Sequence, residues 1–124
     1  MGAGKGGDGP AALVRRCYQA YAAGDRQAME GLLSDDFTFS SPWDDHIGRA
    51  AYFARCWPHS RQIRSIAIED IVEHGPDVFV RYRAALHTGK EFRNVEVFRC
   101  HAGRIAAVDV YFGRTLAEGT DPAP

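Results

Sequence analysis

The sequence has little of several features that would indicate large classes of protein. Its three cysteines, Cys17, Cys56 and Cys100, are odd in number, far apart and without CxxC spacing, so we expect reduced thiols in a cytoplasmic protein. No apolar run approaches the roughly 20 residues of a membrane helix, and no signal-peptide pattern opens the chain. An excess of one charge is also absent. The 15 basic and 16 acidic residues leave a net charge of -1, which argues against binding to nucleic acid or to a membrane surface.

Motifs for metal and phosphate binding are missing as well. Nothing like HxxxH accompanies the run Asp44, Asp45 and His46, so we expect no metal, and no motif indicates a cofactor. The segment GAGKGG lacks the GxxxxGK[ST] spacing of a phosphate loop and follows no strand. Residues 1–10 are instead glycine-rich with little to bury, and we expect a disordered leader there and a flexible tail at 117–124.

The rest of the chain, residues 11–116, contains helical patterns first and strand patterns afterwards. Apolar side chains recur at helical spacing from Pro10 to a stop at Gly24, and Asp25 is a plausible N-cap for a second short helix. A short strand at 37–40 and a loop at 43–48 then lead to a third helix, which Pro58 ends. Alternating strands are predicted at about 63–73, 78–86, 91–100 and 105–112. This order predicts one α+β domain with three N-terminal helices packed on a curved, mainly antiparallel sheet.

Glu96 is the unusual residue of the last strand pair. By parity it shares a strand face with Asn94 and Phe98, where apolar side chains are expected. A three-residue turn, His101 to Gly103, would place Glu96 opposite Val108 in an apolar surround, and we prefer this register. A four-residue turn would place it opposite Asp109 instead, an unfavourable pair of like charges unless the two share a proton. We expect Asp109 on the convex outer face of the sheet.

Three fragments, YAAGDRQAMEGLLSDDFTFSSP, GRAAYFARCWP and NVEVFRCHAGRIAAVDVYFG, occur in the order found in one superfamily. Together with the order of elements, they resemble the NTF2-like superfamily, and most closely its SnoaL-like branch, over about residues 11 to 114. The resemblance implies a cone-shaped fold with a pocket. This fold hosts isomerases, cyclases, dehydratases, epoxide hydrolases and binding modules without catalysis.

The ketosteroid isomerase type within this superfamily uses an aspartate base, a tyrosine and a protonated carboxylic acid. Aligned with that type, the tyrosine position is Cys17, the base position is Ser41 and the acid falls at Glu96. Since two of the three roles are lost, steroid isomerisation by that mechanism is not expected. Glu96 retains the position and chemistry of a pocket acid.

The candidate catalytic residues are Glu96, Asp45 and His46, because a desolvated glutamate can act as an acid or base and the loop could supply the missing base. Each has a structural alternative. Glu96 could be a structural glutamate bonded to Asn94, to a tyrosine or to a pocket arginine, and the loop acids could be solvated or could cap a helix. The residues predicted to line the pocket are Cys17, Tyr21, Ser41, Trp43, Phe53, Trp57, Tyr82, Asn94, Phe98, Val108 and Phe112. Of the histidines, His59, His74, His87 and His101 are expected at exposed positions.

The leading hypothesis is a homodimeric protein that binds a small hydrophobic molecule, and any chemistry would be acid–base work without a cofactor. The alternative is a binding or dimerisation module without catalysis, which a Glu96 held in a salt bridge would favour. Epoxide hydrolysis ranks last, because it needs an arginine between two aspartates and the predicted inward positions offer no arginine. Outward arginines on neighbouring strands, at 81, 83, 93 and 99, are expected to form a basic stripe.

Overall fold

The computed structural model of the protein describes residues 9–116 and starts with two helices. Helix α2 (Pro10–Ala23) has proline in its first turn and ends at Gly24, whose φ of 67° is the left-handed conformation that favours glycine. Helix α3 (Arg26–Leu32) is capped by Asp25, whose carboxylate accepts a hydrogen bond from the Ala28 N–H at 3.1 Å. These predicted start and stop signals are confirmed. Residues 1–8 of the expected leader and the expected tail at 117–124 lie outside the described residues.

The segment after α3 differs most from the prediction. Strand β1 (Leu33–Ser41) begins directly after the helix, and the predicted loop at 43–48 contains strand β2 (Asp44–Gly48), which pairs antiparallel with β1. Helix α4 (Arg49–Arg55) ends before Pro58, which lies in the first turn of a 3-10 helix, η1 (Trp57–Gln62). The sequence DDHIG carries no apolar alternation, so local pattern could not indicate the strand that pairing with β1 creates.

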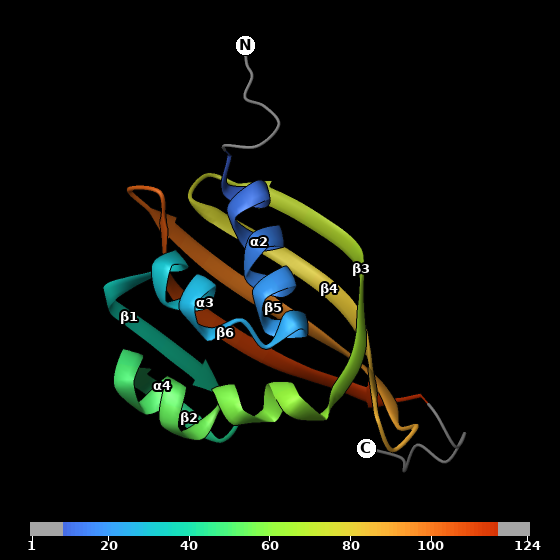
Figure 1. Cartoon of the computed structure of the whole chain (residues 1–124). Helices are drawn as coiled ribbons and strands as arrows, with labels where there is room; N and C mark the ends of the chain where they lie inside the picture. Colours follow the sequence, from blue (N-terminus) through green and yellow to red (C-terminus); the bar gives the residue numbers. More distant parts are fainter. Residues whose placement is uncertain (1–8, 117–124) are drawn as a thin grey trace.

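The remaining strands form consecutive antiparallel hairpins: β3 (Ile63–His74), β4 (Asp77–Leu86), β5 (Glu91–His101) and β6 (Arg104–Thr115). The sheet order is β2-β1-β6-β5-β4-β3, and the single parallel pair among the described strands joins β1 to β6. Figure 1 shows the sheet curving around α2, which crosses its concave side, with α3 and α4 near β1. The predicted α+β cone, with three helices on a curved, mainly antiparallel sheet, is confirmed.

The turn between β5 and β6 is shorter than expected. Ala102 and Gly103 alone form it, with φ angles of 51° and 76°, as in the two-residue hairpin turns that suit the twist of paired strands. The extra residue is taken up by a bulge between Arg99 and Cys100. The preferred three-residue turn was therefore wrong.

This register changes the neighbours of Glu96 but not its side of the sheet. Glu96 is opposite Val110 rather than Val108, and Asp109 is opposite Val97. Val110 is buried whereas Asp109 is exposed, so the two carboxylates lie on opposite faces of the sheet. The glutamate consequently has the apolar cross-strand partner that its parity indicates, at a different position.

The convex face of the sheet is covered by ion pairs rather than by a basic stripe. Arg93 donates two hydrogen bonds to Glu69, at 2.8 and 3.0 Å, and Arg99 donates two to Asp77, at 2.7 and 3.2 Å. The other outward arginines are also paired, Arg81 with Asp70 and Arg83 with Glu91. The four arginines lie on the convex face as predicted, but acids on the neighbouring strands neutralise the predicted basic stripe.

The concave face forms the core with the apolar side of α2. Val14 of the helix and Phe98 and Ile105 of the sheet are almost wholly buried there. No helix within residues 9–116 is long and apolar enough to cross a membrane. All three cysteines have free thiols, and each lies in the described part of the chain.

Candidate functional site

A cavity of about 630 Å³ lies between the helices and the concave face of the sheet. Its walls are mainly apolar and aromatic, and its volume is in the range of sites for small organic ligands. Nine of the predicted pocket residues line it: Cys17, Tyr21, Ser41, Trp43, Tyr82, Asn94, Phe98, Val108 and Phe112. The cavity is therefore an open space that the core side chains do not fill.

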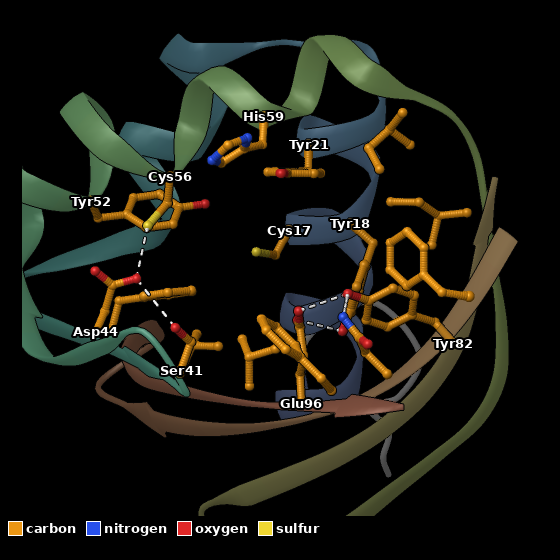
Figure 2. Close-up of a pocket in the computed structure, with 18 of the residues that line it drawn as sticks. Cys17, Tyr18, Tyr21, Ser41, Asp44, Tyr52, Cys56, His59, Tyr82 and Glu96 are labelled. Carbon is orange, nitrogen blue, oxygen red and sulfur yellow. Dashed lines mark hydrogen bonds between the residues drawn. The ribbon is translucent and has the colours of Figure 1, made fainter. Parts of the chain in front are cut away.

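Glu96 lies on the sheet wall of this cavity and is bonded to two tyrosines. The Tyr18 hydroxyl donates to its Oε1 at 2.7 Å, and the Tyr82 hydroxyl donates to its Oε2 at 3.1 Å. Figure 2 shows this group on one side of the cavity. Glu96 has no cation within ion-pair distance among the described residues. The carboxyl group is thus held by neutral donors, and not by a salt bridge.

Burial and hydrogen bonding act on Glu96 in opposite directions. Desolvation raises the pKa of the Glu96 carboxyl, and the hydrogen bonds from Tyr18 and Tyr82, which favour the charged form, lower it by less. Desolvation, with the nearby Glu96 charge as the next cause, raises the pKa of both tyrosines well above its usual value. The tyrosines consequently remain hydroxyl donors, while Glu96 is the group in this cluster that can gain and lose a proton, with a pKa above its usual value.

Asn94 connects the Glu96 cluster to the end of β6. Its Nδ2 donates to the Tyr82 hydroxyl at 2.9 Å, and its Oδ1 accepts from the Gly113 N–H at 3.1 Å. A Cβ on Gly113 would lie only 2.0 Å from the carbonyl oxygen of Arg93, so the glycine permits this close approach of β5 and β6. The YFG segment of β6 therefore supports the orientation of Asn94, and through it that of Tyr82.

Asp44 forms a second polar cluster across the cavity from Glu96, as Figure 2 shows. Its side chain is only 10% exposed, and its Oδ2 accepts from the Ser41 hydroxyl at 3.2 Å and from the Cys56 thiol at 3.9 Å. Its Oδ1 lies 2.6 Å from Nη2 of Arg55 but has no hydrogen-bond partner of good geometry. The ion pair with Arg55 compensates the charge of Asp44. Because Arg55 is largely exposed, Oδ1 remains able to accept a further proton or hydrogen bond.

Asp45 and His46, the predicted loop catalysts, do not reach the cavity. Their side chains are 95% and 72% exposed, and they bond to each other at 2.6 Å. The hydrogen bond that His46 Nδ1 donates to the Asp45 carboxylate raises the pKa of the His46 imidazole, but both groups point to solvent. Their assignment is corrected: Asp45 follows the inward Asp44 and so points outward, and His46 is exposed as well because its positive φ of 50° interrupts the alternation of the strand.

Phe53 and Trp57 are corrected as pocket residues too. Both are buried in packing between helices: the Trp57 ring lies 5.6 Å from that of Tyr21 and 5.9 Å from that of Phe53. The side of α4 and η1 that faces the cavity instead carries Tyr52, Arg55, Cys56, His59 and Gln62. His59, expected at an exposed turn, is exposed and also borders the cavity.

Tyr18 is the most important residue that the sequence analysis did not select. It follows Cys17, the position aligned with the tyrosine of the ketosteroid isomerase type, and it supplies the hydroxyl that Cys17 cannot. The Cys17 thiol donates to Met29 Sδ at 3.6 Å, and burial raises its pKa far above the usual range, so it is not a nucleophile. Tyr18 could have been found from the helical spacing, since it shares the apolar side of α2 with Val14 and Tyr21.

The lining also contains an arginine, Arg55, which the sequence analysis had excluded. It is paired with Asp44, the only aspartate among the described lining residues, so an arginine held between two aspartates is not formed there. Within residues 9–116, no group of three or more His, Cys, Asp or Glu side chains could hold a metal ion.

Comparisons with solved structures agree with the fold. An NTF2-like protein of unknown function from Cytophaga hutchinsonii shares 22% identity, with 87% of this chain and 93% of that chain covered and a TM-score of 0.71. An LEH-like epoxide hydrolase from M. tuberculosis shares 21% identity, with 83% and 81% covered and a TM-score of 0.70. A putative polyketide cyclase from Sinorhizobium meliloti shares 18%, with 79% and 92% covered and a TM-score of 0.68.

These identities are low, so the likeness extends to the fold alone and not to an activity. No curated protein matches the chain. The family model of the SnoaL-like domain, however, matches residues 14–108, which include both Tyr18 and Glu96. With this match over most of its length, and with the cone fold and its cavity, the chain belongs to the SnoaL-like domain family.

Proposed function

We propose that this protein binds a small, mainly apolar molecule in its cavity and transfers protons on it without a cofactor. The observation that carries the proposal is Glu96, a carboxyl group held by Tyr18 and Tyr82 in an otherwise apolar wall and free of any salt bridge to the described residues. Bonds to tyrosines also fit the structural alternative. A chemical role is supported because Glu96 has no cation to hold it ionised, since the cavity arginine pairs with Asp44 instead.

Two carboxyl groups, Asp44 and Glu96, lie across the cavity from each other and have different roles in the proposed reaction. Asp44 removes a proton from a carbon next to a carbonyl group of the ligand through its Oδ1, which forms the ion pair with Arg55 but has no hydrogen bond of good geometry. Glu96, in its protonated form, donates to the carbonyl oxygen, where negative charge develops, while its other oxygen continues to accept from a tyrosine. The C–H bond of the ligand breaks as an O–H bond forms on Asp44, and the O–H bond of Glu96 breaks as an O–H bond forms on the carbonyl oxygen, while the C–H electron pair becomes the C=C bond of the enol. The step is an enolisation, which isomerisation, cyclisation and dehydration share.

The test measures hydrogen–deuterium exchange on a simple carbon acid, 2-tetralone, by proton NMR in D₂O. The native protein is expected to accelerate loss of the α-proton signal, and Glu96→Gln and Asp44→Asn are each expected to slow the catalysed exchange by about 10²-fold or more. Asp45→Asn is the matched control, since it makes the same change at the neighbouring exposed residue and should retain the native rate.

The outcomes separate this proposal from the alternative. If Asp44→Asn and Asp45→Asn slowed the catalysed exchange equally, the role of Asp44 would be contradicted. An unchanged exchange rate in Glu96→Gln would contradict the role of Glu96. No acceleration by a protein that nevertheless binds 2-tetralone in the cavity would favour a binding module without catalysis.

The Asp44–Arg55 pair supports epoxide hydrolysis as a second candidate, since an arginine beside a cavity aspartate could bind an epoxide oxygen. One aspartate among the described lining residues makes it the weaker candidate. Turnover of styrene oxide to its diol by the native protein, with loss in Arg55→Gln, would favour it.

We further propose a homodimer in the cytoplasm. Free thiols at all three cysteines support a reducing compartment, and exposed Phe79 and Tyr111 on the convex face of the sheet support self-association.

A further inference from the structure

The mouth of the cavity carries a group of hydrogen-bond donors that the proposed chemistry does not use. His59 and Gln62 come from η1, Lys90 from the turn between β4 and β5, and Thr115 from the end of β6. The four side chains border the cavity, and none of them forms an ion pair or a hydrogen bond with another side chain of residues 9–116. Lys90 does donate a hydrogen bond to the Thr88 hydroxyl, but from its backbone N–H.

Backbone hydrogen bonds bring these residues to one side of the mouth. The His87 N–H donates to the Gln62 carbonyl at 3.0 Å, and the Leu86 N–H donates to the Lys90 carbonyl at 2.8 Å, which joins η1 to the β4–β5 turn. Thr115 pairs with Phe92 at the start of β5, two residues after Lys90. Figure 2 shows the His59 ring pointing into the cavity from above, well separated from Glu96.

The charges of the lining residues leave the mouth positive. Asp44 is compensated by Arg55, and Glu96 is bonded by tyrosine hydroxyls deep on the sheet wall. Lys90 is then the one charged lining residue without an opposite charge or a hydrogen-bonded partner on its side chain among the described residues. Glu91, next to it, is already paired with Arg83 on the convex face.

We propose that the ligand of this cavity is an organic acid, with an apolar body against the aromatic walls and an anionic group at the mouth, bound by Lys90 with His59 and Gln62. A carboxylate or phosphate would form an ion pair with Lys90 and accept hydrogen bonds from the N–H groups of His59 and Gln62. The opposite end of the molecule would then reach Glu96. This inference rests on the cavity being the ligand site of the proposed function.

The test compares two dyes with the same aromatic body. One, 8-anilinonaphthalene-1-sulfonate, is an anion, and the other, N-phenyl-1-naphthylamine, lacks the sulfonate and is neutral. Lys90→Gln is expected to weaken binding of the anionic dye by about two- to fivefold, and Lys90→Glu is expected to weaken it more. Binding of the neutral dye should not change in either variant. In the native protein, added salt should weaken binding of the anionic dye but not of the neutral dye.

Two further variants make the result specific. Arg61→Glu removes an exposed positive charge of η1 that does not border the cavity and should change neither affinity appreciably. Cys17→Phe fills the centre of the cavity, into which the Cys17 side chain points in Figure 2, and should weaken both dyes, with a melting curve to verify folding.

Competition identifies the anion. Displacement of the neutral dye by 2-naphthoate or by 2-naphthyl phosphate should exceed displacement by 2-naphthamide, and the stronger of the two acids indicates whether a carboxylate or a phosphate is preferred. The inference would be overturned if 2-naphthamide displaced the neutral dye as well as the two acids do, or if Lys90→Glu did not change binding of the anionic dye. Either result would leave the cavity as a ligand site. Binding of neither dye, or binding of both unaffected by Cys17→Phe, would contradict the proposed ligand site itself.

Discussion

Glu96 is the residue whose protonation links the stability of the fold to pH. Because burial raises its pKa in the folded state, the folded protein holds a proton that the unfolded chain releases at lower pH. The stabilisation from that proton is complete below the ordinary pKa of glutamate, about 4.3, and is lost as pH rises through the raised value. The exposed acids Glu69 and Asp77 act in the other direction, since arginines lower their pKa and their contribution is lost in acid.

We therefore predict that Glu96→Gln changes the pH dependence of stability. The melting temperature of the native protein should fall relative to that of the variant as pH rises from about 4.3 through the raised pKa of Glu96, because glutamine keeps hydrogen bonds to the tyrosines and carries no charge to desolvate. Thermal unfolding followed by circular dichroism at several pH values measures the difference. Parallel curves for the two proteins over this range would show that Glu96 does not titrate in the folded state as inferred.

At the same scale, neighbouring residues of one strand have opposite environments. Asp44 is nine-tenths buried on the cavity side of β2, whereas Asp45 is almost wholly exposed. Successive side chains of a strand point to opposite faces, which explains the contrast between Asp44 and Asp45, although the positive φ of His46 interrupts the alternation at the next residue. It could not be applied beforehand, because DDHIG was interpreted as a loop.

At the scale of the element, the β5–β6 hairpin decides which side chains face the cavity. Its two ends are set by glycine, Gly103 in the turn and Gly113 beside the bulge at Arg93. The first needs a positive φ, and the second leaves room for a neighbouring carbonyl group.

We predict that Gly113→Ala destabilises the protein by about 2 kcal/mol, because the added methyl group would overlap the Arg93 carbonyl and displace β5 from β6. Urea unfolding gives the free energy. Gly31→Ala is the control, since nothing lies within 4 Å of its added Cβ in α3 and alanine should stabilise that helix by about 0.5–1 kcal/mol. A Gly113→Ala variant as stable as the native protein would show that the strands can separate there at little cost.

At the scale of the whole molecule, the convex face combines neutralised ion pairs with exposed aromatic side chains. Tyr111 is 61% exposed and Phe79 is 41% exposed on this face, and the arginines around them are already paired within the chain. Such a face can associate with a second copy without burying an unpaired charge.

We predict a dimer with twice the 13.7 kDa mass of the chain, measured by light scattering after size-exclusion chromatography. Tyr111→Arg should shift the mass to that of the monomer, because it places an unpaired charge in the interface. Trp43→Ser removes an even more exposed aromatic residue from the cavity side of the fold and should leave the dimer intact. A monomer in the native protein, or a dimer unaffected by Tyr111→Arg, would contradict this interface.

The sequence by itself determined the elements that have local signals. Pro10, Gly24 and Asp25 fix the first two helices through bonds within a few residues, and strict alternation identifies the four long strands. Alternation also put Glu96 on the strand face of Phe98, and Asp109 on the strand face away from Val108 and Val110, since parity within a strand does not depend on the partner strand. That these are different faces of the sheet depends on the register between the two strands.

Only the tertiary structure decided what depends on pairing and distance. Strand β2 exists because β1 pairs with it, the place of Glu96 opposite Val110 follows from a bulge without a sequence signal, and Tyr18 becomes a site residue because α2 crosses the sheet above Glu96. These contacts join residues far apart in the chain. Their geometry is set by packing of the whole domain and not by the local conformational preferences that a sequence pattern reports.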